Sequence, residues 1–126
     1  MPTSPQNADK YDRLDGVLRG AAEVRLVYAE RSSYQGQPVI LTEYGGISLN
    51  TSNDGDKWGY YENAEDEEEY LARLEIITRK LLENPLIKGF CYTQMTDVMQ
   101  EANGLLTIDR QPKADMERLN RIFSGK

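Results

Sequence analysis

The sequence predicts an α/β fold with parallel strands. Two short apolar runs, 39–44 and 87–93, have the length and composition of buried strands. Residues 63–83, which lie between them, show the apolar spacing of a helix long enough to cross from one strand to the next. A strand, a full crossover helix and a second strand imply a parallel pair. Long polar loops follow both strands, as expected where the carboxyl ends of the strands carry the functional residues.

The chain before the first strand is less regular. Residues 1–8 are rich in Pro, Ser, Thr and Asn and predict a disordered lead-in. The remaining residues, 9–126, have the length of one ordinary domain or of a piece of a larger one. Residues 9–19 show helical spacing. Residues 23–29 alternate between polar and apolar types and fit either a strand or the tail of a helix, and a polar loop is expected over 31–37.

The first strand ends in one carboxylate followed by two glycines. Gly45 and Gly46 predict a tight exit from the strand, so Glu43 stands at the carboxyl end of an otherwise apolar segment. Two interpretations stay open: Glu43 is an active-site carboxylate, or it is an edge residue that points to water. The loop 47–62 that follows is long enough to be functional and carries the only tryptophan, Trp58.

The helix over 63–83 is the clearest element in the sequence. Asn63 is its expected N-cap, and Asn84-Pro85 is expected to end it. The acidic run 65–69 suits the positive end of the helix dipole, so it predicts a solvated helix start and no metal site. An apolar stripe is expected to face the core; it consists of Tyr70, Leu71, Leu74, Ile77, Leu81 and Leu82.

The second strand, 87–93, contains Cys91, which we expect to be a small core residue. A polar loop over 94–111 follows, with a turn signal at Asn103-Gly104. A last helix is expected over 113–123. Its inward residues are predicted to be Met116, Leu119, Ile122 and Phe123.

Composition limits the chemistry. The net charge of −6 argues against nucleic acid or an anionic membrane as a partner. No apolar run approaches the length of a membrane span, and no signal-peptide pattern follows Met1. A single cysteine fits a reducing compartment, so we expect a cytoplasmic protein. Because the chain has no histidine, it has no Ser-His or Cys-His nucleophile, and we expect neither a metal nor a cofactor.

Two segments of the sequence resemble a known family. They are Gln-Pro-Val-Ile-Leu-Thr-Glu-Tyr-Gly-Gly at 37–46 and Gly-Phe-Cys-Tyr-Thr-Gln-Met-Thr-Asp-Val-Met-Gln-Glu-Ala-Asn-Gly-Leu at 89–105. Together they resemble the end of the catalytic domain of glycoside hydrolase family 2, which includes β-galactosidases, β-glucuronidases and β-mannosidases. That domain is a (β/α)8 barrel. The resemblance spans 37–123 and implies a partial TIM barrel, in which the last βα units contribute parallel strands.

The resemblance also implies roles for individual residues. It places Glu43 as the nucleophile at the end of barrel strand seven, with 89–94 as strand eight. A retaining glycosidase needs a second carboxylate about 5–5.5 Å away as acid/base. Tyr92, Gln94, Asp97 and Glu101 would lie near the sugar, at or beyond the end of strand eight. Two further candidates for substrate binding come from the residues themselves: Tyr44 by its position beside Glu43, and Trp58 as an aromatic ring that can stack on a sugar.

The sequence departs from the family in two respects. The family's acid/base glutamate lies in an Asn-Glu pair, and this chain has no Asn-Glu dipeptide. The earlier strands of the barrel are also missing. We therefore expect 9–126 to be the C-terminal fragment of the TIM-barrel domain of a β-galactosidase-like enzyme. This fragment is expected to be inactive alone, and its expected partners are a carbohydrate and the upstream part of the barrel. Exposed strand edges predict self-association. The alternatives are a non-catalytic carbohydrate-binding or assembly module and an independent small α/β protein.

Overall fold

The computed structural model describes residues 31–49 and 63–126. Within them lie two strands and two helices, in the order β1 (Val39–Gly45), α3 (Glu67–Glu83), β2 (Ile87–Thr93) and α4 (Met116–Ser124). The strands pair in parallel, with α3 as the crossover, so the predicted α/β character is confirmed. The lead-in, the helix expected over 9–19, the segment 23–29 and Trp58 lie outside the described residues.

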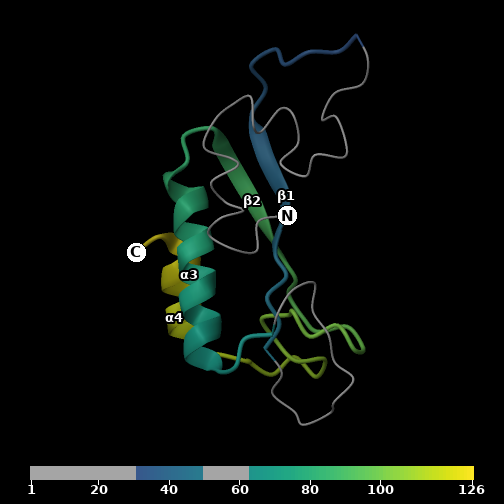
Figure 1. The fold of residues 1–126 in the computed structure, drawn as a ribbon, viewed down its shortest axis with the longest axis vertical. Coiled ribbons are helices and arrows are strands. Elements are labelled where there is room, and N and C mark those ends of the chain that lie inside the picture. The colour runs from purple at the N-terminus through teal and green to yellow at the C-terminus, as the bar shows by residue number, and fades with distance from the viewer. Residues whose placement is uncertain (1–30, 50–62) are drawn as a thin grey trace.

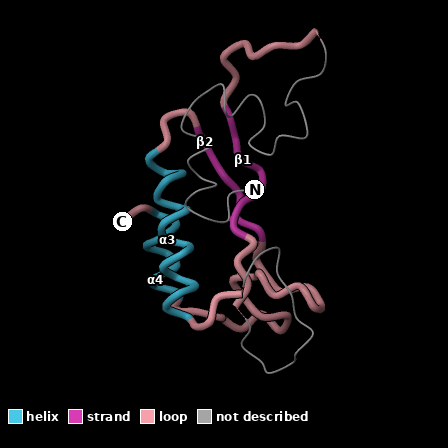
Figure 2. Tube along the Cα trace, viewed as in Figure 1, coloured by secondary structure: helices cyan, strands magenta, loops and turns pink. Residues whose placement is uncertain are grey.

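Both helices lie on the same side of the strand pair (Figure 1). The strands and α3 run in opposite directions, as a β–α–β crossover requires. Figure 2 shows that the loop between β2 and α4 lies beyond the carboxyl ends of the strands. This end of the sheet therefore holds the residues that the sequence singled out.

The two faces of the sheet differ in burial. Phe90 and Tyr92 of β2 pack against the core, as does Leu41 of β1. Since side chains alternate along a strand, Cys91 points to the other face, where it is exposed. The expectation that Cys91 is a core residue is therefore wrong. Ile40 lies on the same open face and is 55% exposed.

The first helix begins later than the sequence predicted. Asp66, not Asn63, is the N-cap of α3, and its side chain accepts a hydrogen bond from Glu69 N at 2.8 Å. Asn63 fails as a cap because the next residue, Ala64, forms a parallel bridge with Leu49, and Ala64 N donates to Ser48 O at 2.8 Å. The chain is thus tied to the segment after β1 before the helix starts.

The core lies between α3 and the sheet. Its largest fully buried side chains include Tyr44, which β1 inserts against α3. Leu82 was expected in the stripe but is 43% exposed, because it lines an open groove beside α4 and is not covered by the sheet. The stripe residues that are buried are Tyr70, Leu71, Leu74, Ile77 and Leu81.

The last helix also starts late. α4 begins at Met116 behind the N-cap Asp115, whose side chain accepts from Arg118 N at 2.7 Å. Lys113 is not helical, since its backbone N–H donates to Leu105 O at 3.1 Å and its side chain is buried. Met116 is 50% exposed, so its predicted inward position is wrong. In the described part of the chain, no helix has both the length and the apolar character needed to span a membrane.

Candidate functional site

The position of Glu43 depends on a break in the register of the two strands. Leu41 pairs with Phe90 and Tyr44 pairs with Tyr92, so three steps along β1 match two steps along β2. The extra residue on β1 makes a bulge at Thr42 and Glu43, which we call the 42–43 bulge. Both of its residues are exposed.

The bulge decides which face Glu43 occupies. In a regular strand, Glu43 would share the helix-facing side with Leu41, because side chains alternate with a period of two. The extra residue instead returns Tyr44 to the helix side, where it is fully buried. Glu43 is left exposed, opposite Cys91 on the open face. An ionised carboxylate thereby avoids burial in the apolar layer under the sheet.

The glycines after Glu43 let the two strand ends come close together. Gly45 has a φ of 99°, and a Cβ on it would lie 2.3 Å from the ring atom Cε2 of Tyr92. Only glycine fits there. The next residue, Gly46, donates its N–H to Thr93 O at 3.1 Å. These contacts hold the exit from β1 against the end of β2, as the sequence predicted for a tight turn.

The two tyrosines assigned to substrate binding point to the core. The hydroxyl of Tyr44 lies 3.0 Å from Thr78 Oγ1 on α3, and the hydroxyl of Tyr92 lies 3.1 Å from that of Tyr70. The Tyr92 hydroxyl also donates to Asn103 O at 3.2 Å. Tyr44 and Tyr92 are therefore placed to support the strand ends from the helix side. Their direct contact with a sugar stays a prediction.

Burial keeps these hydroxyls neutral. It raises the pKa of Tyr70 to about 12, and the hydrogen bond between the Tyr70 and Tyr92 hydroxyls only partly offsets this. Burial also raises the pKa of Tyr44 and of Tyr92 well above the usual range. The edge-to-face contact between the Tyr44 and Tyr92 rings, with centroids 5.6 Å apart, excludes water from the same layer.

Three of the predicted site residues meet at Asn103. Its side-chain Oδ1 accepts from Gln94 Nε2 at 2.8 Å, and its Nδ2 donates to Glu101 Oε1 at 3.1 Å. Its backbone oxygen is the acceptor for Tyr92. Asn103 is fully buried. The sequence marked it only as part of a turn, because nothing in the spacing of 94–105 shows which side chains turn inward.

Asp97 is held by an internal ion pair. Lys113 Nζ lies 2.9 Å from Asp97 Oδ1 and 3.1 Å from Oδ2, and it also donates to Ala102 O at 2.7 Å. Oδ1 accepts a further hydrogen bond from Gly104 N at 2.9 Å. Both carboxylate oxygens thus bind protein donors, and the pair fixes the loop after β2. Contact between Asp97 and substrate stays a prediction.

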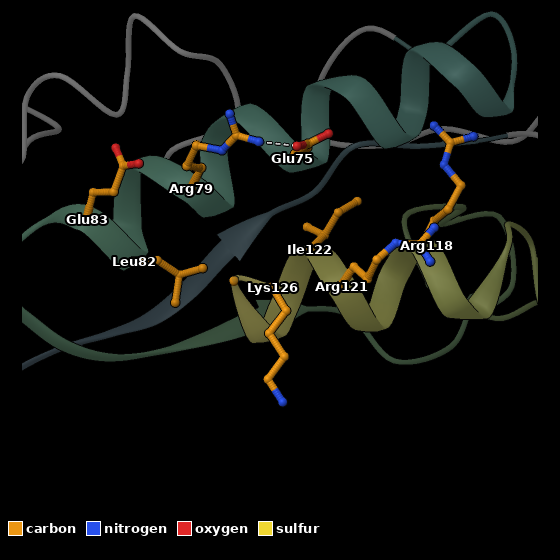
Figure 3. Close-up of a pocket in the computed structure, with 9 residues that line it drawn as sticks. Glu75, Arg79, Leu82, Glu83, Arg118, Arg121, Ile122 and Lys126 are labelled. Atoms are coloured by element: carbon orange, nitrogen blue, oxygen red, sulfur yellow. Dashed lines mark hydrogen bonds and ion pairs between the residues drawn. The ribbon is translucent and has the colours of Figure 1, made fainter.

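A groove of about 330 Å³ lies between α3 and α4 (Figure 3). None of the sequence-predicted site residues lines it. Leu82 and Ile122 are its apolar residues, and Arg79 is paired with Glu75 at its edge. Among the described residues, no group of three acidic or cysteine side chains is arranged to hold a metal ion. The candidate site therefore comprises the 42–43 bulge and the loop after β2.

Comparison of the sequence with known protein families finds no match, and comparison with curated proteins finds none either. Solved structures do resemble it. The structure of Bifidobacterium dentium β-glucuronidase complexed with coumarin-3-O-glucuronide has a TM-score of 0.48 and 24% sequence identity. The similarity covers 71% of this chain but only 15% of that chain. It is a distant likeness to a small part of a glycoside hydrolase, and it assigns neither a family nor an activity to the present protein.

Proposed function

We propose that this chain is the nucleophile-bearing end of a retaining glycosidase barrel of the β-galactosidase type. Glu43 is the nucleophile in this proposal and attacks the anomeric carbon of a β-glycoside. The acid/base that completes the pair belongs to a part of the barrel that this chain does not contain. The chain alone is therefore inactive, and its two partners are a carbohydrate and the upstream βα units.

The 42–43 bulge is the observation that carries the proposal. A nucleophilic carboxylate must be ionised and must reach the substrate, and the bulge gives Glu43 the exposed face at the carboxyl end of its strand. Bulges that re-aim a side chain are common at barrel rims and next to active sites. The parallel β–α–β unit with its helices on one face supports the barrel, because one repeat of a barrel has this arrangement.

Within the described residues, the two predicted site acids of the loop after β2 are both held by other side chains. Glu101 is tied to Asn103, and Asp97 is buried against Lys113. Neither carboxylate is thus arranged to act as a general acid toward a bond at Glu43. This supports a fragment that needs the upstream barrel for catalysis.

The test uses a longer parent chain that contains this segment. A 2-deoxy-2-fluoro-β-galactoside should label Glu43 covalently, and mass spectrometry of the peptides should locate the adduct. Glu43→Gln should abolish labelling and lower kcat by about four orders of magnitude or more. Glu83→Gln is the matched control, since it removes the same charge from an exposed position at the far end of α3.

Three outcomes would contradict parts of this proposal. Labelling of another residue would overturn the assignment of Glu43. Sugar binding without labelling would favour the non-catalytic carbohydrate-binding or assembly module. Hydrolysis of aryl glycosides by the purified 126-residue chain, lost in Glu43→Gln, would overturn its dependence on an upstream partner.

A further inference from the structure

We propose that the groove between α3 and α4 docks an acidic peptide segment of another protein, which inserts one large apolar side chain between Leu82 and Ile122 (Figure 3). We call it the α3–α4 groove. It is separate from the candidate site, because both helices lie on one side of the strand pair and Glu43 is exposed on the other. In a complete barrel the helices form the outer ring, so the groove would face outward there too.

Contacts at both ends of the groove fix the spacing of the two helices. At the start of α4, both terminal guanidinium nitrogens of Arg118 donate to the carboxylate of Glu68 on α3. At the other end, Gly125 lies close to α3, since a Cβ on it would be 3.1 Å from Leu82 Cδ1. The groove between these contacts is therefore preformed, and a ligand need not spend binding energy on opening it.

The groove offers apolar surface for one side chain. Leu82 is 43% exposed and Ile122 is only partly buried, so both still have apolar surface that a ligand can cover. The volume of about 330 Å³ lies at the lower end of the range for ligand pockets, about 300–1,000 Å³. It therefore suits a single anchor side chain of a partner, as found at the centre of many protein interfaces.

The charge of the groove determines the chemistry of the partner. Four basic and two acidic side chains line it, although the whole chain has a net charge of −6. Two of the basic residues, Arg79 and Arg118, are in ion pairs with acids of α3. The other two, Arg121 and Lys126, form no ion pair within 31–49 and 63–126. A carboxylate of the partner can pair with Arg121 without displacing an existing partner, which favours an acidic segment.

The two signs of charge lie on different sides of the groove. The acidic residues Glu75 and Glu83 belong to α3, whereas Arg121 lies in α4 and Lys126 follows it closely. The carboxylates of the partner are therefore expected along α4. A nucleic acid fits less well, because it carries phosphates along its whole length and would bring some of them against Glu83. It also has no apolar side chain to place against Leu82.

The test titrates the ¹⁵N-labelled 126-residue chain with a synthetic peptide, acetyl-Glu-Glu-Phe-Glu-Glu-amide. The peptide should shift the backbone amide signals of Arg121, Ile122 and Gly125, with a Kd of about 1 mM or below. Replacing its Phe by Ser should weaken binding about tenfold, because the apolar anchor is lost. Replacing every Glu by Lys should abolish saturable binding, because the charges then repel.

Variants of the chain locate the binding. Arg121→Gln should weaken binding of the acidic peptide about threefold to fivefold, since one exposed ion pair is lost. Leu82→Ala removes part of the apolar wall and should weaken it about threefold. Arg110→Gln is the matched control: it removes the same charge from an exposed position outside the groove and should leave the Kd unchanged. Amide signals of the core strands that stay in place show that each variant is folded.

An absence of saturable shifts at about 5 mM peptide would overturn the inference. Equal affinity for the Ser-containing or the Lys-containing peptide would do the same, and so would an unchanged Kd in Arg121→Gln. A short DNA duplex is titrated in parallel, and tighter binding of the duplex to the same groove would replace the peptide by a polyanion. None of these outcomes depends on labelling of Glu43 in the parent chain, so this inference and the proposed function are judged independently.

Discussion

Replacing Gly45 by alanine tests how closely the ends of the two strands must approach. Gly45 combines a φ of 99° with a Cβ position only 2.3 Å from Tyr92 Cε2 and 2.7 Å from Cδ2. Gly36 offers a matched control, because its φ is 88° but, apart from its chain neighbours, no atom of the described residues lies within 4 Å of its Cβ position. The two substitutions thus share the cost of a positive φ, and the steric conflict is added only at Gly45, which is buried.

The expected losses in the free energy of unfolding follow from the backbone cost and the steric conflict. A left-handed conformation costs an alanine about 1–2 kcal/mol, and reduced freedom of the unfolded chain returns up to about 1 kcal/mol. Gly36→Ala should therefore lower the free energy of unfolding by about 1 kcal/mol. Gly45→Ala adds the displacement of a packed ring, which costs about 1–3 kcal/mol more. Its total loss should be about 2–4 kcal/mol, a large share of the stability of a small domain.

Urea denaturation followed by far-ultraviolet circular dichroism measures both losses. The steric origin has its own check: Gly45→Ala combined with Tyr92→Ala should lose about 1–2 kcal/mol less than the sum of the single variants, because the obstructing ring is gone. Equal losses in Gly45→Ala and Gly36→Ala would refute the proposed close approach of the strand ends. So would strict additivity in the double variant.

Two further predictions concern the buried groups around the site. Lys113→Met should lower the free energy of unfolding by about 3–5 kcal/mol in urea, because Asp97 is left buried without its partner. Arg79→Met is the control: it breaks an exposed pair and should cost about 1 kcal/mol or less, and equal losses would contradict this account. Burial raises the pKa of Tyr70 from 10.0 to about 12, so we expect the protein to lose stability at high pH. Burial of the neutral hydroxyl stabilises the fold fully below pH 10, and this contribution is lost as pH rises toward about 12, because the unfolded chain releases its proton first. The melting temperature should fall across that range, and a flat profile would contradict the prediction.

The sequence predicted the elements better than their ends. Both strands and their parallel pairing follow from the apolar runs and the length of the crossover, and β2 has the predicted bounds, Ile87–Thr93. The helix starts were wrong because contacts with distant segments use the residues just before each helix. Ala64 bonds to Ser48, and Lys113 bonds to Leu105 and Asp97. Capping preferences act locally and carry no information about such partners.

The candidate site was likewise predicted only in part from the sequence. The position of Glu43 at the end of an apolar strand is visible in the sequence, but its side of the sheet is not, since regular alternation would have turned it toward α3. Asn103 was passed over for a similar reason. Its role depends on Tyr92, Gln94 and Glu101 converging on one buried amide.

For this protein, the sequence by itself determined an α/β unit with one carboxylate at the end of an apolar strand, followed by two glycines. Periodicity and composition fix these features because they depend on neighbours within a few residues. Only the tertiary structure decided that Tyr44 is buried and that Glu43, beside it, is exposed. That choice depends on the register between strands 48 residues apart, as in the pairing of Val39 with Ile87. Packing of Tyr44 against Thr78 and Tyr92 sets that register, and no local pattern contains those contacts.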